Sequence, residues 1–248
     1  PPLYSWHRRR WSRQLKGLFC YGDLGASFFH RIGFSSTIVH PIAYTVDAAG
    51  ARSAAAAPAD PSNIRRLTFV GSQLRRKGLD LLLQALQRIG ATSAWTLDVV
   101  TADDVGAYRK TLSGSPIGDR ITFHPPMPNA QVRALMDQAD TLVLPSRYDG
   151  WGAVVNEALH AGTRVIVSDR AGACCLVRAD WRGRIVKAGS AAALEAALRA
   201  ELAAPRASAA ERARIRDWAQ AAISPEAMAD YFLAILEGDR RPPPWVTA

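Results

Sequence analysis

The sequence predicts an α/β protein with a Rossmann-like, doubly wound parallel sheet, and three features support this. From residue 65 onward, short apolar runs alternate with segments whose apolar residues recur at the helical period. The apolar runs are nearly continuous, which is typical of strands covered by helices on both faces of a sheet. Right-handed crossovers between such strands give a domain that binds ligands beyond the carboxyl ends of the strands.

Composition narrows the class further. At 248 residues the chain suffices for one large α/β domain or for one and a half smaller ones, and 48% hydrophobic residues is ample for a core. Its apolar runs fall short of the roughly 18 to 20 residues that cross a bilayer. Three cysteines, of which Cys174 and Cys175 are adjacent, match neither a disulfide framework nor a zinc site. A reducing, cytoplasmic setting fits this cysteine usage.

The first 16 residues concentrate the positive charge. They hold five cations and no acid, whereas the whole chain has a net charge of +9 at pH 7. The cations and the interleaved indoles are Arg8, Arg9, Arg10, Arg13, Lys16, Trp6 and Trp11. Residues 6–16 therefore suit an anionic membrane surface, although a solvated helix with its tryptophans packed inward is an open alternative. We expect no nucleic-acid partner, because no RNA- or DNA-binding module accompanies these residues.

Before the regular alternation begins, residues 15–47 predict a short α/β piece. Leu18–Cys20 is apolar, Leu24–Arg31 has a helical pattern, and Ser36–His40 is rich in strand-forming residues and stops at a proline. Residues 48–63 are rich in alanine, with glycine and proline and no periodicity. We interpret them as a linker.

The later elements follow from apolar runs that end at glycine or a polar cluster, and from apolar residues three and four apart. The predicted strands are Leu67–Val70, Trp95–Val100, Ile121–Phe123, Thr141–Leu144, Arg164–Val167 and Arg184–Val186. The predicted helices are Lys77–Ile89, Val105–Leu112, one from Asn129, one from Trp151, Ala191–Leu202, Ala209–Ala222 and Pro225–Leu236. We expect the proline-rich tail from Arg240 to be extended.

The loop after the first predicted strand is G-S-Q-L-R-R-K-G, Gly71–Gly78. A glycine ends the strand, three cations follow, and the predicted helix opens near Lys77. Free N–H groups at a helix start, together with these cations, suit a diphosphate. The loop matches neither a Walker loop nor the dinucleotide fingerprint, and a solvated basic loop is the alternative interpretation.

The loop after the fourth predicted strand carries two acids, in P-S-R-Y-D-G-W-G-A-V-V-N-E-A-L-H-A-G. Asp149 lies in the turn, and Glu157 lies on the following helix, off its buried stripe. At 1.5 Å per residue they are offset by roughly 8 to 10 Å, too far to share a proton but suited to gripping two parts of one ligand. Carboxylates accept hydrogen bonds from vicinal hydroxyls, and Gly150 and Gly152 let the backbone approach a ligand. Singly, each acid has a plainer interpretation, as an N-cap and as a solvated helix residue.

Together the two loops resemble the carboxyl-terminal domain of the GT-B glycosyltransferases, specifically glycosyltransferase family 4. The resemblance rests on F-V-G-S-Q-L-R-R-K-G-L-D-L-L-L-Q-A-L, on A-D-T-L-V-L-P-S-R-Y-D-G-W-G-A-V-V-N-E-A-L-H-A-G-T-R-V-I-V-S-D, and on the spacing between them. It covers roughly residues 64–203. The second motif is the more specific of the two.

The resemblance implies a role for each acid. Glu157 matches the second acid of the E-x7-E motif, which binds the nucleotide ribose. Asp149 matches the first acid, which faces the donor sugar, with the backbone of Gly150, Trp151 and Gly152 nearby. Because Asp149 replaces the usual glutamate and is one methylene shorter, its reach to the sugar is reduced.

The resemblance also implies the remaining donor contacts. Lys77 matches the lysine that holds the donor diphosphate, and the nucleobase is expected near His124–Met127, after the third strand. Ser72 stands where many members have a second diphosphate-binding cation, an arginine. Arg76, which is adjacent to Lys77, is the better candidate to supply that charge, and Arg75 is the alternative.

Members of the family have two Rossmann-like domains with the acceptor between them. Residues 1–47 resemble only the last portion and hinge of the amino-terminal acceptor domain, followed by the linker at 48–63. Residues 64–222 correspond to the donor-binding domain, and residues 223–248 to the closing helix and tail. We therefore expect this chain alone to bind a nucleotide-sugar and to be poorly active.

The implied function is transfer of a sugar, with retention, from a nucleotide-diphosphate donor to a glycan or lipid-linked acceptor. No metal and no cofactor are expected, and no residue is assigned as catalytic. The basic start hints at a peripheral position on the inner face of the membrane. A non-catalytic nucleotide-sugar-binding subunit that needs a partner chain, or another GT-B enzyme such as a nucleotide-sugar epimerase, are the alternatives. A flavodoxin-like signalling domain is disfavoured, because Gly71–Gly78 is basic where that class needs acids.

Overall fold

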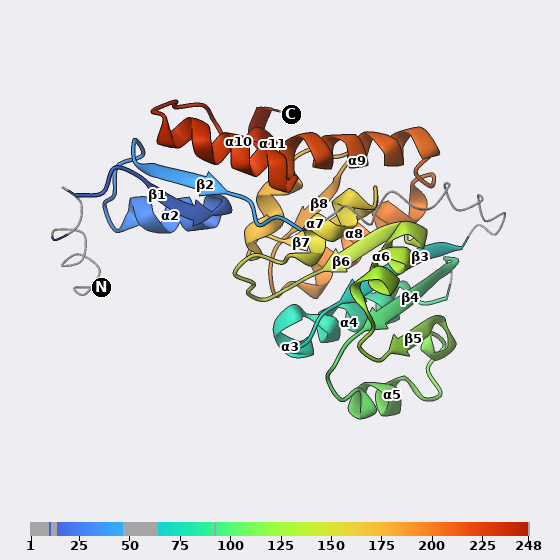
Figure 1. Cartoon of the computed structure of the whole chain (residues 1–248). Helices are drawn as coiled ribbons and strands as arrows, with labels where there is room; N and C mark the ends of the chain where they lie inside the picture. The colour runs from blue at the N-terminus through green and yellow to red at the C-terminus, as the bar shows by residue number, and fades with distance from the viewer. Residues whose placement is uncertain (1–9, 11–13, 47–63, 92, 248) are drawn as a thin grey trace.

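The computed structural model describes residues 10, 14–46, 64–91 and 93–247 (Figure 1). Within them, a sheet of six parallel strands forms the centre of the larger domain. Its strands are β3 (Arg65–Val70), β4 (Trp95–Val100), β5 (Ile121–His124), β6 (Thr141–Leu144), β7 (Arg164–Ser168) and β8 (Gly183–Val186). The predicted α/β class and the six predicted strands are confirmed, with small differences in their bounds.

Helices connect the strands, and further helices follow the last strand of the sheet. They are α3 (Leu74–Lys77), α4 (Leu79–Ile89), α5 (Gly106–Leu112), η1 (Gly118–Arg120), α6 (Asn129–Gln138), α7 (Val154–His160), η2 (Gly172–Leu176), α8 (Ala191–Ala203), α9 (Ala209–Ile223), α10 (Pro225–Leu236) and α11 (Pro244–Thr247). Helices α9 and α10 begin at Ser208 and Ser224, whose hydroxyls accept backbone hydrogen bonds from the first turn.

The strand order is β5-β4-β3-β6-β7-β8, so the chain starts in the middle, runs to one edge and then returns to build the other half. The direction reverses between β3 and β6, which pair in parallel through Leu67 with Thr141 and Thr68 with Leu142. In doubly wound sheets a ligand crevice opens at this switch point, beyond the carboxyl ends of the strands. The two loops that meet there follow β3 and β6, and both were singled out from the sequence.

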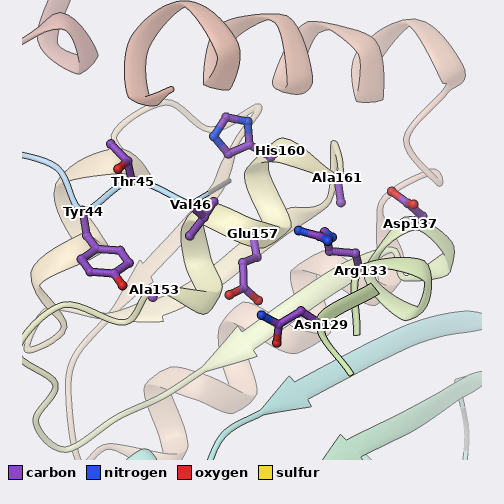
Figure 2. A pocket seen from close by; sticks show the side chains of 10 residues that line it. All are labelled: Tyr44, Thr45, Val46, Asn129, Arg133, Asp137, Ala153, Glu157, His160 and Ala161. Atoms are coloured by element: carbon purple, nitrogen blue, oxygen red, sulfur yellow. The ribbon is translucent and has the colours of Figure 1, made fainter. Parts of the chain in front are cut away.

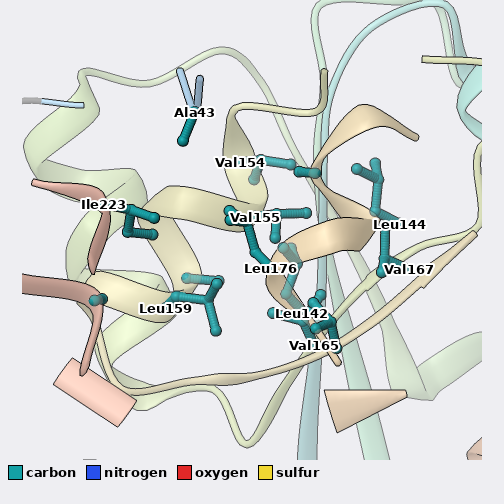
Figure 3. Packing of buried hydrophobic residues seen from close by; sticks show 14 of the residues in the cluster. Ala43, Leu142, Leu144, Val154, Val155, Leu159, Val165, Val167, Leu176 and Ile223 are labelled. Atoms are coloured by element: carbon teal, nitrogen blue, oxygen red, sulfur yellow. The ribbon is translucent and has the colours of Figure 1, made fainter. Parts of the chain in front are cut away.

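Both faces of the sheet are covered, as the continuous apolar runs predicted. Along β6, Leu142 and Leu144 join a buried cluster with α7 and α9, while Val143 between them joins the cluster formed with α4 and α8. Figure 3 shows the first cluster, in which Val155 and Leu159 of α7 pack over the strands. This packing fixes the position of α7 on the sheet.

The predicted helix Lys77–Ile89 begins two residues later, as α4 at Leu79, because Gly78 separates it from the short helix α3. Gly78 has a φ of +84°, and a Cβ at this position would lie 2.3 Å from the carbonyl oxygen of Pro145. Only glycine lets the loop after β3 approach the loop after β6 this closely. The helical period of the leucines carries no sign of this break, because the contact that requires it is made 67 residues away in sequence.

Two other boundaries differ from the predictions. Helix α7 begins at Val154 rather than Trp151, although Trp151 is buried as predicted. The tail is not extended to its end, because α11 places Trp245 in the core with 1% of its surface exposed. An indole of this size buries enough apolar surface to hold a short segment that propensity alone leaves unstructured.

The amino-terminal piece forms a two-stranded parallel sheet, made by β1 (Leu18–Tyr21) and β2 (Val39–Ile42), with α2 (Gly22–Arg31) between them. The second strand begins three residues later than predicted. The ring of Phe19 on β1 packs 4.3 Å from that of Phe232 on α10, between ring centroids. Gly22 lies against Trp151 and Gly172 of the larger domain.

Two sequence expectations fall largely outside the described residues: the membrane-suited segment 6–16 and the linker at 48–63. Among the helices that are described, none combines the length and hydropathy of a membrane span.

Candidate functional site

The loops after β3 and β6 are joined by backbone and side-chain hydrogen bonds. The Arg147 backbone N–H donates to the carbonyl of Arg76 at 2.8 Å, and Arg76 Nη1 donates to the carbonyl of Tyr148 at 3.0 Å. The Arg147 guanidinium holds the Asp80 carboxylate through two bonds of 2.7 Å. The basic loop is therefore one half of a braced pair of loops, in which Arg76 and Lys77 are half-buried.

At the centre of this pair, Asp149 meets two of the predicted cations. Its carboxylate accepts a hydrogen bond from Lys77 Nζ and lies 3.9 Å from Arg76 Nη1. Asp149 itself is buried, with 8% of its surface exposed. Arg75 and Ser72 are exposed in the same loop, and the backbone carbonyl of Arg75 accepts a hydrogen bond from Arg147 Nη1. The structure thus brings together Asp149, Lys77 and Arg76.

The helix start that was expected to bind a diphosphate has an acid of its own in the first turn, Asp80. The carboxylate of Asp80, at the second position of α4, accepts hydrogen bonds from its own backbone N–H and from that of Leu81. Burial alone would raise the pKa of Asp80, but the bonds to Arg147 and to these backbone groups outweigh it, and the pKa falls below its usual value. Asp80 therefore competes with any ligand for the N–H groups of this helix start, and the binding of a diphosphate there stays a prediction.

The two glycines of the acidic turn differ in what they provide. Gly152 has a φ of +94°, and a Cβ there would lie 2.9 Å from Leu144 Cδ2, so a side chain does not fit. Gly150 is exposed, with nothing within 4 Å of where a Cβ would lie. Packing against Leu144 and the positive φ require glycine at position 152. At Gly150 there is open space at the surface of the turn.

Trp151 connects the turn to the segment that leads out of β2. Its indole N–H donates to Asn156 Oδ1 at 2.8 Å, and Asn156 Nδ2 donates to the carbonyl of Tyr44 at 2.6 Å. Trp151 and Asn156 are both buried. Trp151 therefore acts through packing, and the structure buries it behind the turn instead of exposing it to a ligand.

Glu157 lies in a cavity of about 260 Å³ between α6 and α7 (Figure 2). The residues that line it are Tyr44, Thr45, Val46, Asn129, Arg133, Asp137, Ala153, Glu157, His160 and Ala161. Burial raises the pKa of the Glu157 carboxyl above its usual value, and the charge of Arg133 acts against this rise. A carboxylate beside a cation in a partly enclosed cavity suits a neutral, hydroxyl-bearing ligand group.

Two further titratable residues of the cavity are His160 and Asp137. Burial lowers the pKa of His160, so its ring is neutral at neutral pH, and the ring packs into the protein with 7% of the residue exposed. Burial raises the pKa of Asp137, against the charges of Arg212, Arg216 and Arg133. His160 thus forms a wall of the cavity, in keeping with a structural role.

The predicted nucleobase residues, His124 and Met127, are not among the residues that line the cavity. His124 Nε2 is 2.6 Å from Asp98 Oδ1, and Met127 packs against the core cluster. Sequence reasoning missed Asn129, Arg133 and Tyr44, which do line the cavity. The four-residue spacing of Asn129 and Arg133, continued by Asp137, places them on one face of α6, but only the packing of α6 beside α7 shows that this face borders Glu157.

Comparison with known proteins identifies the family. A family model described as glycosyl transferases group 1 matches residues 55–220, two thirds of the chain and including both loops of the switch point. The chain belongs to this family. Its membership agrees with the GT-B resemblance of the two motifs.

Relatives with similar sequences carry names of the same class. The chain is 30% identical to glycogen synthase of Mycobacterium tuberculosis over 189 residues, which is 72% of this chain and 44% of that protein. It is 28% identical to D-inositol 3-phosphate glycosyltransferase 1 of Catenulispora acidiphila over 193 residues, 71% of this chain and 46% of that protein. The chain therefore spans less than half the length of these curated relatives.

Solved structures share the fold. Sucrose-phosphate synthase from Thermosynechococcus elongatus superimposes with a TM-score of 0.67 at 25% identity, over 91% of this chain and 59% of that one. Alr3699/HepE from Anabaena, solved in complex with UDP and glucose, has a TM-score of 0.72 at 16% identity, over 95% of this chain and 67% of that one. The fold is that of the GT-B glycosyltransferases.

Proposed function

We propose that this chain is the donor-binding part of a retaining glycosyltransferase that moves a sugar from a nucleotide-diphosphate donor to a glycan or lipid-linked acceptor. One observation carries this proposal: Lys77 and Arg76 meet Asp149 in the loop after β6, and Glu157, on the helix that follows this loop, lines a cavity. A nucleotide-sugar has matching ends, with an anionic diphosphate and a ribose that bears two neighbouring hydroxyls. Family membership supports the same class of reaction.

In this proposal Glu157 accepts hydrogen bonds from the ribose hydroxyls, and Lys77 and Arg76 bind the diphosphate. An ionised carboxylate offers four lone-pair sites, enough for two hydroxyls at once. The nucleobase lies near Asn129, the first residue of α6, on the side toward His124 and Met127. The exposed turn at Gly150 faces the sugar end of the donor.

The chemical step breaks the bond between the anomeric carbon and the diphosphate oxygen, and the electron pair leaves with the diphosphate. Lys77 and Arg76 stabilise the charge that builds on that oxygen, an electrostatic contribution that needs no metal or cofactor in the proposed mechanism. The acceptor hydroxyl forms the new bond on the same face, and the departing diphosphate oxygen takes up its proton. No side chain of the described residues is assigned as its base.

The acceptor is bound elsewhere in the proposed whole enzyme. The relatives are more than twice as long as their matched regions, and β1, α2 and β2 form only a small sheet beside the donor domain. We infer that a further α/β domain, in a partner chain or a preceding segment, completes the acceptor site. A cytoplasmic enzyme that associates peripherally with the membrane through residues 6–16 fits a lipid-linked acceptor.

A calorimetric titration against UDP-, GDP- and ADP-sugars tests the donor site. We expect one donor to bind, and Glu157→Ala to weaken it by roughly 30- to 100-fold, the loss typical of hydrogen bonds to a charged group. Glu237→Ala, at an exposed position after α10, serves as the matched control and should bind like the wild type. Equal affinity of wild type and Glu157→Ala would remove the ribose assignment, and no binding of any donor would remove the proposed function.

The same samples separate the two alternatives. A nucleotide-sugar epimerase converts the donor with no acceptor present, which NMR of the sugar protons detects directly. A non-catalytic subunit binds the donor but shows neither conversion nor transfer after its partner domain is supplied.

A further inference from the structure

The carboxylate of Asp149 faces protein groups on both sides. Oδ2 accepts a hydrogen bond from Lys77 Nζ, while Oδ1 accepts from the Trp151 backbone N–H at 3.4 Å and lies 3.9 Å from Arg76 Nη1. Only 10% of the Asp149 side chain is exposed. The carboxylate is thus folded back into its own turn and does not lie in the cavity that contains Glu157.

The backbone of Asp149 is fixed by the neighbouring loop. Its N–H donates to the carbonyl of Arg170 at 3.0 Å, and its own carbonyl accepts from the Gly172 N–H at 3.2 Å. With the backbone pinned on both sides, only the two side-chain torsions can move the carboxylate. An aspartate is also one methylene shorter than glutamate, so a swing from Lys77 to a sugar ring is restricted.

The protein holds the stem of Lys77 in place, and its ammonium group can still bind an anion. Its methylene stem lies along Gly71, where an added Cβ would be 3.6 Å from Lys77 Cγ and Cε, and 14% of the side chain is exposed. An ammonium group has three N–H donors. One donor to Asp149 leaves two for phosphate oxygens.

We propose that Asp149 is the counter-ion and positioning residue of Lys77, and not a ligand of the donor sugar. This role rests on the proposed diphosphate site. Asp149 holds the ammonium against the turn and neutralises it, and an incoming diphosphate competes with the carboxylate for that charge. A diphosphate therefore binds more weakly than the two cations alone would allow.

Lysine reactivity tests the ion pair without any ligand. The chain has four lysines, Lys16, Lys77, Lys110 and Lys187, so each is readily followed by mass spectrometry after acetylation with an N-hydroxysuccinimide ester. We expect Lys77 to react more slowly than the exposed Lys110. Asp149→Asn should raise the Lys77 rate roughly three- to tenfold and leave Lys110 unchanged, because the amine is no longer held on a carboxylate.

Two further variants make this measurement specific. Asp149→Glu restores the charge and should restore the slow reaction of Lys77. Asp119→Asn, at an exposed position before β5, removes a carboxylate far from the site and should change neither rate. Unchanged Lys77 reactivity in Asp149→Asn would overturn the proposal, whatever the protein binds.

Titration with UDP, GDP and ADP, and with the sugar donor of whichever binds, tests the competition. We expect Asp149→Asn to bind the nucleoside diphosphate roughly three- to tenfold more tightly, since an ion pair no longer has to be broken. A sugar ligand would behave differently: Asp149→Asn would then lose affinity for the sugar donor and keep the wild-type affinity for the diphosphate, and that result would overturn the proposal.

The outcomes separate this proposal from the donor site on which it rests. If the wild type binds no nucleoside diphosphate, the proposed function fails. The reactivity of Lys77 then still tests whether Lys77 and Asp149 form an ion pair. If the wild type binds and Asp149→Asn does not tighten the diphosphate, the donor site stands and the counter-ion role fails.

Discussion

The two ends of the proposed site differ in how their acidic side chains are surrounded. We define the phosphate end as the loops Gly71–Gly78 and Pro145–Gly152 together with the first turn of α4, and here Asp149 and Asp80 are paired with cations of the chain itself. At the nucleoside end, which is the cavity between α6 and α7, burial raises the pKa of Glu157 even though Arg133 is close. Two acids of one sequence motif thus have opposite surroundings, because one sits in a braced turn and the other on a helix beside a cavity.

The difference teaches that spacing within a motif does not set the environment of its members. At the phosphate end, Arg147 and Asp80 brace the two loops by pairing with each other, so substitutions of these bracing residues should act mainly on stability. At the nucleoside end the Glu157 carboxylate loses solvation in the cavity. Replacing it should therefore raise stability and weaken ligand binding.

The largest expected effect is at Gly78, where the two loops of the phosphate end cross. Gly78→Ala should lower the free energy of unfolding by about 3 kcal/mol, because a Cβ would meet the Pro145 carbonyl at 2.3 Å on a backbone with φ of +84°. Gly150→Ala, in the same region but with open space around it, should change it by less than about 0.5 kcal/mol. Urea denaturation measures both, and equal effects would mean that the crossing is not tight.

The next effect is at Asn156, which supports the nucleoside end. Asn156→Ala leaves the Trp151 indole N–H and the Tyr44 carbonyl without this partner, and should cost about 2 to 3 kcal/mol of unfolding free energy. Asn129→Ala, an exposed residue of the cavity lining, is the control and should cost little. A small effect of Asn156→Ala in urea denaturation would show that water replaces both bonds.

Glu157→Gln should raise the stability of the protein in a pH-dependent way. Because the folded protein raises the Glu157 pKa, the folded state binds the proton more tightly than the unfolded state, and Glu157 lowers stability as pH rises through the shifted pKa. Glu157→Gln should therefore melt about 1 to 2 °C higher than the wild type at neutral pH. The difference should vanish below the usual carboxyl range, and a gain that persists in acid would contradict this explanation.

The smallest expected effect is at the exposed brace of the phosphate end. Asp80→Asn should lower the unfolding free energy by about 0.5 kcal/mol, because the pair with Arg147 is partly exposed. The loss should shrink at high salt, and also as pH falls through the depressed Asp80 pKa, where the wild type loses the same charge. Thermal melts at two salt concentrations measure it, with Asp119→Asn as the exposed control, and a salt-independent loss would point to the helix start instead.

Much of the fold was accessible from the sequence because its signals are local. The bounds of β4, β6 and α10 match the predictions, since apolar runs and a proline at the start of a helix mark them directly. The break at Gly78 and the burial of Trp245 were not predicted, because each depends on a contact distant in sequence.

The candidate site was only partly accessible. The sequence indicated that Lys77, Arg76 and Asp149 belong near one ligand, and the structure brings these three together. It did not indicate that Asp149 turns toward Lys77, nor that Asp80 occupies the start of α4, because such choices among neighbouring charges are made by packing and not by residue type. The assignment of Glu157 to the ribose remains a prediction, to which the cavity adds support.

The hydrogen bonds of Asn156 have a consequence for how the molecule opens. This one buried amide holds Trp151 in the turn of the phosphate end and Tyr44 over the cavity of the nucleoside end. Neither end can loosen without releasing the other, so we expect the backbone amides of both to share one protection factor in native-state hydrogen exchange. A ligand that occupies only the cavity should then slow exchange in the turn by the same factor.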